Sequence, residues 1–169
     1  MSTGTVVWIT GLPSSGKSTL AAQLARRLGE RGRAACTLDG DEVRKVLVPA
    51  PGYTPEARDA FYATLAGLAA LLAAQGLVVI VPATAHRAAY RAEARRMAPA
   101  FVEVHVAVDA EECRRRDAKG LYAATGEGRA AGLPGADLAY EPPGSPDVIA
   151  QGGHDEEAIA AVLAILATR

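Results

Sequence analysis

A glycine-rich octapeptide near the start of the chain has the residue types that bind a triphosphate. It reads Gly-Leu-Pro-Ser-Ser-Gly-Lys-Ser over residues 11–18 and fits the pattern G-x-x-x-x-G-K-[ST]. Such a loop turns its backbone N–H groups toward one anion, its lysine reaches the β- and γ-phosphates, and its last hydroxyl ligates Mg²⁺. We therefore expect ATP and Mg²⁺ as cofactors, bound by Gly11, Pro13, Ser14, Ser15, Gly16, Lys17, Ser18 and Thr19.

Two carboxylates, Asp39 and Asp41, follow the second predicted strand. Ligands of open α/β sheets bind at the carboxyl ends of the strands, which places both carboxylates near the phosphate loop. One of them can orient Mg²⁺-bound water, and the other can accept the proton of an attacking hydroxyl. Arg44, one helical turn after Asp41, would face the same cleft and suits an anionic substrate. The alternative is a solvated turn in which an aspartate caps a short helix.

The elements that must position these residues alternate along the chain. Apolar runs predict strands over 5–10, 34–38, 77–81, 101–108 and 147–149. Helical spacing predicts helices over 18–28, 42–47, 55–75, 87–97, 110–116 and 155–167. Alternation of this kind predicts an α/β fold of the P-loop NTPase type, with a mainly parallel five-stranded sheet between two helical layers. We expect one domain over residues 1–169, with a lid or a disordered stretch at about 117–145, where glycine and proline gather.

Composition narrows the classes of partner. A net charge of −1 gives no general attraction to nucleic acid, and no apolar run is long enough to span a membrane. The N-terminus lacks the layout of a secretory signal, so we expect a cytoplasmic protein in which Cys36 and Cys113 stay reduced. No guanine-reading element of the GTPases is found. Small size and the candidate lid favour a kinase that acts on a small molecule.

Several segments together resemble the adenylylsulfate kinase family. They read GLPSSGKST from residue 11, LDGDEVR from residue 38, GYTPEAR from residue 52, CRRRDAKGLY from residue 113 and YEPP from residue 140. The resemblance implies ATP-dependent phosphorylation of the ribose 3′-hydroxyl of adenylyl sulfate, with Asp41 as acid/base, Lys17 and Asp39 beside it, and Ser18 and Asp39 at the metal. It also implies Arg116 and Asp117 near ATP and a lid that closes over both nucleotides. The family often pairs, and the sequence leaves open whether this chain forms a homodimer. The acceptor would be bound by Arg44, Arg58, Phe61, Arg87, Lys119 and Leu133.

The acceptor side departs from the family pattern. Phe61 and Thr64 stand where the family carries Asn and Arg, and Leu133 lies in the stretch that usually offers a stacking Phe. Two alternatives therefore stay open. The enzyme could phosphorylate another nucleotide or a biosynthetic hydroxyl compound, or the chain could be a nucleotide-binding module without turnover. A polynucleotide kinase is disfavoured by the neutral charge.

Overall fold

The computed structural model describes residues 3–169 and contains one sheet in which every pairing is parallel. The strand order is β2-β3-β1-β4-β5. The strands are β1 (Thr5–Thr10), β2 (Ala35–Thr37), β3 (Val78–Pro82), β4 (Phe101–Val106) and β5 (Val148–Ala150). The helices are α1 (Lys17–Glu30), α2 (Gly40–Val46), α3 (Pro55–Ala73), α4 (Ala88–Met97), α5 (Ala110–Arg116), α6 (Leu121–Gly126) and α7 (Glu156–Ala167). The predicted fold class is confirmed.

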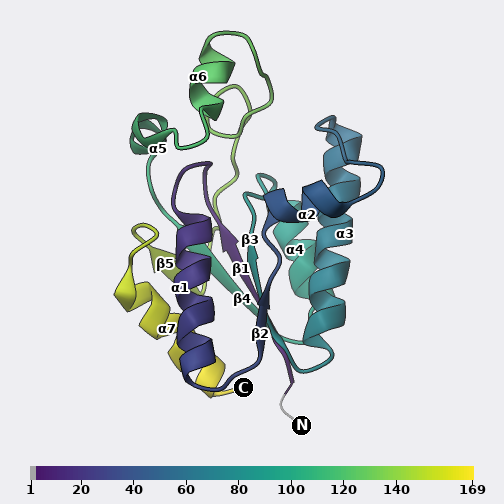
Figure 1. The fold of residues 1–169 in the computed structure, drawn as a ribbon, viewed down its shortest axis with the longest axis vertical. Coiled ribbons are helices and arrows are strands. Elements are labelled where there is room, and N and C mark those ends of the chain that lie inside the picture. Colours follow the sequence, from purple (N-terminus) through teal and green to yellow (C-terminus); the bar gives the residue numbers. More distant parts are fainter. Residues whose placement is uncertain (1–2) are drawn as a thin grey trace.

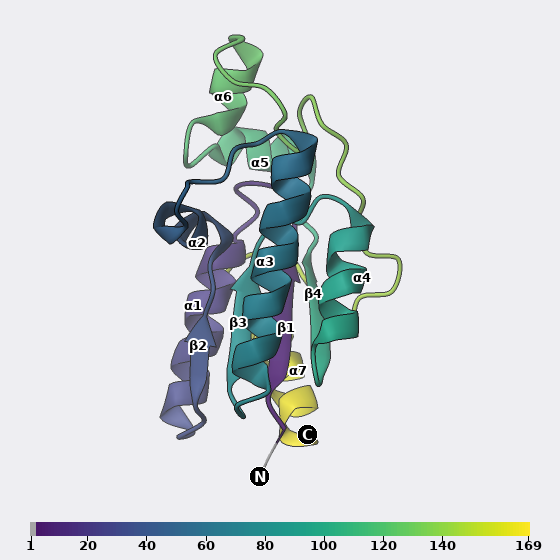
Figure 2. The ribbon, with the colours of Figure 1, turned by 90° about the vertical axis from the view of Figure 1, so that its right-hand side faces the viewer.

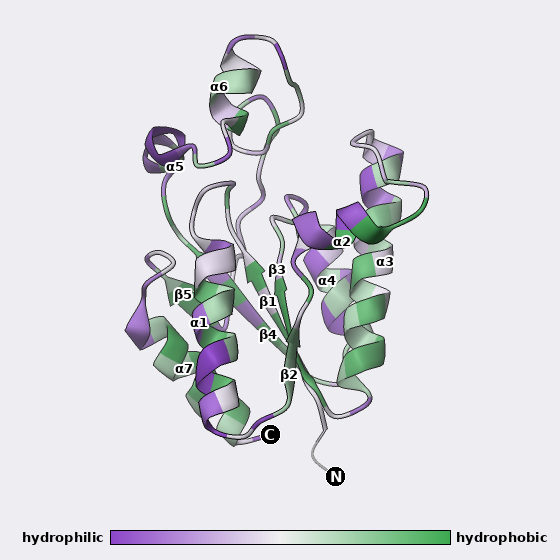
Figure 3. Ribbon diagram, viewed as in Figure 1, coloured by the Kyte–Doolittle hydropathy of each residue, from purple (hydrophilic) through white to green (hydrophobic). Residues whose placement is uncertain are grey.

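Helices cover both faces of the sheet. Figure 1 shows α1 and α7 on one side and α3 with α4 on the other, and Figure 2 shows α3 lying along the strands. Strand β1 faces both layers, because Val7 and Ile9 belong to the α1–α7 core while Val6 and Trp8 belong to the α3–α4 core. The inner residues of β1, Val6 to Ile9, are buried on both sides and are all apolar, and Figure 3 shows β1 and β3 in green.

Local signals set most helix starts. The Thr54 hydroxyl accepts from the Ala57 N–H and Pro55 opens α3, as expected for a capped helix. Asp39, Asp109 and Asp155 cap α2, α5 and α7 in the same manner. Across residues 3–169, none of the helices combines the length and apolar character of a membrane span.

The segment between α5 and β5 is more ordered than the sequence predicts. It contains a short helix, α6, which stands with α5 beyond the carboxyl ends of the strands (Figure 1). The Asp117 carboxylate accepts from the Tyr122 and Ala123 N–H groups and so fixes the start of this helix. The hydroxyl of Tyr122 donates to the Pro13 carbonyl at 2.9 Å. The sequence predicted no helix in this stretch, so α6 was missed.

Candidate active site

The loop between β1 and α1 has the curled backbone that phosphate binding requires. Ser14 and Gly16 take left-handed φ values of 64° and 103°, and the Ser15 N–H donates to the Leu12 carbonyl at 3.2 Å. Helix α1 begins directly afterwards at Lys17. Backbone N–H groups and a helix N-terminus therefore meet at one point, which is the requirement for binding an anion.

Close packing behind the loop explains two glycines. A Cβ on Gly16 would lie 2.6 Å from the Gly153 nitrogen, and a Cβ on Gly153 would lie 2.8 Å from the Thr19 Cβ. The β5–α7 loop thus presses against the phosphate loop at a distance that side chains would prevent. His154 follows in the same loop, and its Nδ1 lies 2.9 Å from the Gln23 amide nitrogen.

Lys17 is the cation of the loop. Its ammonium donates to the Leu12 carbonyl at 2.8 Å. Burial lowers the pKa of Lys17 to about 8, and the negative charge of Asp41 opposes this shift. An anion placed beside the ammonium would raise the pKa again, so triphosphate binding is coupled to protonation of Lys17.

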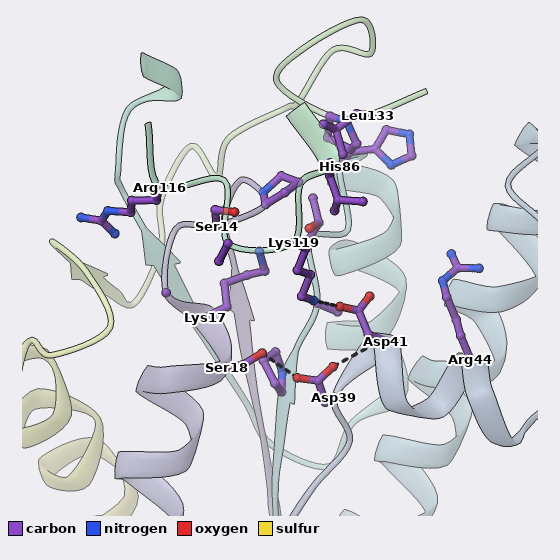
Figure 4. A pocket seen from close by; sticks show the side chains of 18 of the residues that line it. Ser14, Lys17, Ser18, Asp39, Asp41, Arg44, His86, Arg116, Lys119 and Leu133 are labelled. Carbon is purple, nitrogen blue, oxygen red and sulfur yellow. Dashed lines mark hydrogen bonds and ion pairs between the residues drawn. The ribbon is translucent and has the colours of Figure 1, made fainter. Parts of the chain in front are cut away.

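Ser18 and Asp39 meet in front of the loop. The Ser18 hydroxyl donates to Asp39 Oδ2 at 2.6 Å, and Asp39 Oδ1 accepts from the Asp41 N–H at 2.9 Å (Figure 4). Asp39 therefore caps α2 with one carboxylate oxygen and contacts the phosphate loop with the other, so capping the helix does not prevent a role at the phosphate loop. Within residues 3–169 no three His, Cys, Asp or Glu side chains cluster as a metal cage. A hydroxyl and one carboxylate fit Mg²⁺, which typically keeps several waters and takes few protein ligands.

Asp41 points across the cleft toward the segment after α5. Its carboxylate forms an ion pair with Lys119, drawn as a dashed line in Figure 4. The two side chains are 57% and 60% exposed. Ion pairs this exposed contribute about 0–1 kcal/mol, so a bound anion can draw Lys119 away from Asp41.

Aromatic rings hold the arginine of α2. The Arg44 guanidinium lies 3.8 Å from the centre of the Phe61 ring and 4.5 Å from that of Tyr53. Phe61 is 3% exposed and does not line the cavity. It packs against the guanidinium of Arg44 from the protein interior. Arg58, on the same helix as Phe61, donates to the Gly132 carbonyl at 2.5 Å.

One cavity of about 700 Å³ joins the two halves of the site. Its volume is typical of ligand pockets. The predicted site residues that line it are Pro13, Ser14, Gly16, Lys17, Ser18, Thr19, Asp39, Asp41, Arg44, Arg58, Arg116, Lys119 and Leu133. The predicted residues outside the lining are Gly11, Ser15, Asp117, Phe61 and Arg87. Arg87 lies 3.4 Å from Asp59 instead.

The cavity also contains residues that sequence reasoning missed. Tyr62 lines it in place of Phe61, and its hydroxyl accepts from the Ala85 N–H at 3.0 Å. His86 lines the same side, where burial, assisted by the positive charge of Arg58, lowers its pKa. His154 lines the side of the phosphate loop. The helical repeat places Tyr62 one turn from Arg58, which is a usable signal, whereas nothing local marks His154.

Comparison with known proteins agrees with this geometry. The sequence matches the model of the "Adenylylsulphate kinase" family over residues 3–151. The chain belongs to the adenylylsulfate kinase family. Curated relatives named adenylyl-sulfate kinase include that of Paraburkholderia xenovorans, 42% identical over 86% of this chain and 82% of its own, and a probable one of Pyrococcus abyssi, 39% identical over 86% and 83%.

A solved structure extends the agreement to three dimensions. The APS kinase of Mycobacterium tuberculosis, in complex with AMPPNP and APS, superposes with a TM-score of 0.91 at 35% identity, covering 99% of each chain. Adenylylsulfate kinases are ATP-dependent enzymes that phosphorylate a hydroxyl group of adenylyl sulfate, and the chain described here is an ATP-dependent phosphotransferase of this family.

Proposed function

We propose that this chain transfers the γ-phosphoryl group of Mg²⁺–ATP to the ribose 3′-hydroxyl of adenylyl sulfate. One observation carries the proposal: Lys17, the Ser18–Asp39 pair and Asp41 line the same cavity as Arg44 and Arg58. A phosphate-binding loop, a metal-binding pair, a carboxylate base and acceptor-side arginines therefore meet in one space.

The residues divide the reaction between them. The phosphate loop and Lys17 bind the β- and γ-phosphates, and Ser18 with Asp39 would hold Mg²⁺, which neutralises charge on the phosphates when bound. Asp41 accepts the proton of the 3′-hydroxyl as the oxygen forms its bond to the γ-phosphorus. The bond from that phosphorus to the bridging oxygen breaks, and ADP leaves. Arg44 and Arg58 orient the anionic end of the acceptor.

We further propose that residues 117–145 form the lid of a single domain spanning 1–169. The lid contributes Lys119, Leu133 and Pro134 to the cavity. Its contact to the base is the exposed Lys119–Asp41 pair, so a closing lid exchanges this pair for contacts to phosphate. Closure would exclude water from the transferring group. Arg116, the last residue of α5, and Asp117, the first residue of the lid, would act at the ATP end of the cavity, Arg116 as a lining residue and Asp117 through the fold of α6.

The acceptor half supports a second candidate, an enzyme of the same type with a different nucleotide acceptor. Leu133 and Pro134 give the cavity an aliphatic wall, and Phe61 and Arg87 lie outside the lining, so direct roles for these two in acceptor binding are less well supported. A charge-assisted hydrogen bond to an acceptor is worth about 1.5–3 kcal/mol, and each one missing would weaken binding by about tenfold or more.

A coupled assay of ADP release decides between the two. Wild-type protein with Mg²⁺–ATP is titrated with adenylyl sulfate and, in parallel, with AMP, other nucleotides and the nucleoside adenosine. ADP release that saturates with adenylyl sulfate supports the first proposal, and release with another nucleotide alone supports the second. ATP binding without turnover across the panel would contradict both. The homodimer and the cytoplasmic location stay proposals. Analytical ultracentrifugation of the purified protein would test the first, and cell fractionation would test the second.

A further inference from the structure

Arg91 on α4 is a buried cation outside the cavity. Its side chain is 2% exposed. It donates through Nη1 to the Ala85 carbonyl at 2.5 Å and through Nη2 to the Glu141 carbonyl at 2.6 Å, and its Nε lies 3.4 Å from Glu103 Oε2. A buried charge is costly unless it is paired, so a core position that needed only volume would be better served by an apolar residue.

The partners of Arg91 come from three segments that are distant in sequence. Ala85 belongs to the β3–α4 loop, Glu103 to β4, and Glu141 to the end of the lid. The same end of the lid is fixed twice more, because the Glu141 N–H donates to the His86 carbonyl at 2.8 Å and its carboxylate accepts from the Ala88 N–H at 2.7 Å.

Tyr140 connects this cluster to the phosphate loop. The Arg91 guanidinium lies 5.8 Å from the centre of the Tyr140 ring. The Tyr140 hydroxyl lies 2.8 Å from Thr10 Oγ1, which donates its own proton to the Thr84 carbonyl at 2.6 Å. Because the threonine proton is already used, Tyr140 is the donor in this pair. Thr10 is the last residue of β1, and Gly11 opens the phosphate loop directly after it.

We propose that Arg91 and Tyr140 are positioning residues for phosphoryl transfer. They fix two segments relative to the phosphate loop: the end of the lid and the β3–α4 loop. The β3–α4 loop lines the acceptor side of the cavity through Thr84 and His86. Donor and acceptor subsites are thereby built on one rigid cluster. Misplacement of reacting atoms by about 1 Å can cost about two orders of magnitude in rate, so such a cluster acts on turnover rather than on binding. This inference rests on the kinase activity proposed above.

The test is a double-mutant cycle on the hydroxyl pair, with Tyr140→Phe, Thr10→Val and the double variant. Tyr140→Phe, which removes one hydrogen bond, is expected to lower kcat about three- to tenfold, with a KM within about twofold of wild type. Thr10→Val also removes the bond to the Thr84 carbonyl and should lower kcat at least as much. The double variant should match Thr10→Val, because Thr10→Val already removes the bond to Tyr140. Tyr90→Phe is the matched control, since its hydroxyl donates to Asp59 on α3 and not to the lid.

A purely structural role predicts a different pattern. It would lower the melting temperature of the variants and leave kcat at the wild-type value, and that result would overturn the proposal. Arg91→Lys, which keeps the charge but not the forked donors, should show the same loss of kcat. If Arg91→Lys fails to fold, the double-mutant cycle on Tyr140 and Thr10 still tests the proposal.

Trypsin gives a readout that does not depend on the acceptor. Arg129 is an exposed residue of the lid, and a non-hydrolysable ATP analogue should slow cleavage after it in the wild type. Tyr140→Phe should be less protected than Tyr90→Phe, and equal protection would count against the proposal. If the wild type releases no ADP with adenylyl sulfate, only the proposed acceptor is refuted. The positioning role of Arg91 and Tyr140 can still be tested by trypsin protection with the ATP analogue.

Discussion

ATP binding is expected to weaken as the pH rises through 8, because Lys17 loses its proton. Burial lowers the pKa of Lys17 to about 8 in the free protein. The phosphates of bound ATP favour the charged ammonium and raise this pKa. The affinity for ATP is therefore highest below the pKa of Lys17 in the free protein and falls as the pH rises above it. The phosphates themselves are already ionised above about pH 7.

The size of the effect follows from the protonated fraction. With a free pKa of about 8, Lys17 is about 90% protonated at pH 7 and about 10% at pH 9, so the dissociation constant should rise roughly tenfold. Isothermal titration calorimetry with a non-hydrolysable ATP analogue and Mg²⁺ at pH 7, 8 and 9 measures this. At pH 8, buffers of different ionisation enthalpy should report an uptake of about half a proton.

Two variants sharpen the experiment. Lys17→Arg keeps its charge throughout this range, so whatever affinity remains should be independent of pH. Lys45→Arg is the matched control, because Lys45 is an exposed lysine of α2 paired with Glu42, and it should retain the full wild-type dependence. Equal wild-type affinities at pH 7 and pH 9, or a tenfold loss that persists in Lys17→Arg, would refute the reasoning.

Further predictions concern the base, the metal and the packing of the loop. Asp41→Asn should lower kcat by about 10²–10⁴ and leave ATP affinity nearly unchanged, as measured by steady-state kinetics and calorimetry. Ser18→Ala should raise the Mg²⁺ concentration needed for half-maximal rate, because it removes one oxygen ligand; an unchanged Mg²⁺ titration would argue against its role. Gly153→Ala should lower both the melting temperature and ATP affinity, because its methyl group would lie 2.8 Å from the Thr19 Cβ. Gly29→Ala, in open space within α1, should raise stability by about 0.5–1 kcal/mol in chemical denaturation.

The local sequence predicted the positions of the strands well, and their lengths less well. Strand β1 was foreseen at its full length, because its buried centre, Val6 to Ile9, is a continuous apolar run with a β-branched threonine at each end. The predicted strand over 101–108 ends at Val106, since its neighbours in β1 and β5 supply partners no farther than His105 and Val106. The extent of a strand depends on its partners, which the segment itself does not encode.

In the site, too, the features built by one local motif were predictable and those that join distant segments were not. The phosphate loop is predictable because one continuous motif builds it. The pairing of Asp41 with Lys119 joins residues 78 positions apart, and it depends on how the lid folds over α2. The helix within that lid was missed because its start is set by Asp117, outside any apolar repeat. Phe61 was predicted as an acceptor-binding residue, but the neighbouring Tyr62 lines the cavity, because α3 turns Phe61 toward Arg44.

The strand order has a consequence for behaviour in solution. The two outermost strands, β2 and β5, have three residues each, whereas the inner strands have five or six. A sheet edge presents unpaired N–H and C=O groups, which can recruit strands from other molecules. Edges this short offer little template for such growth. The architecture that gathers the site at one end of the sheet therefore also protects a strongly apolar sheet against aggregation.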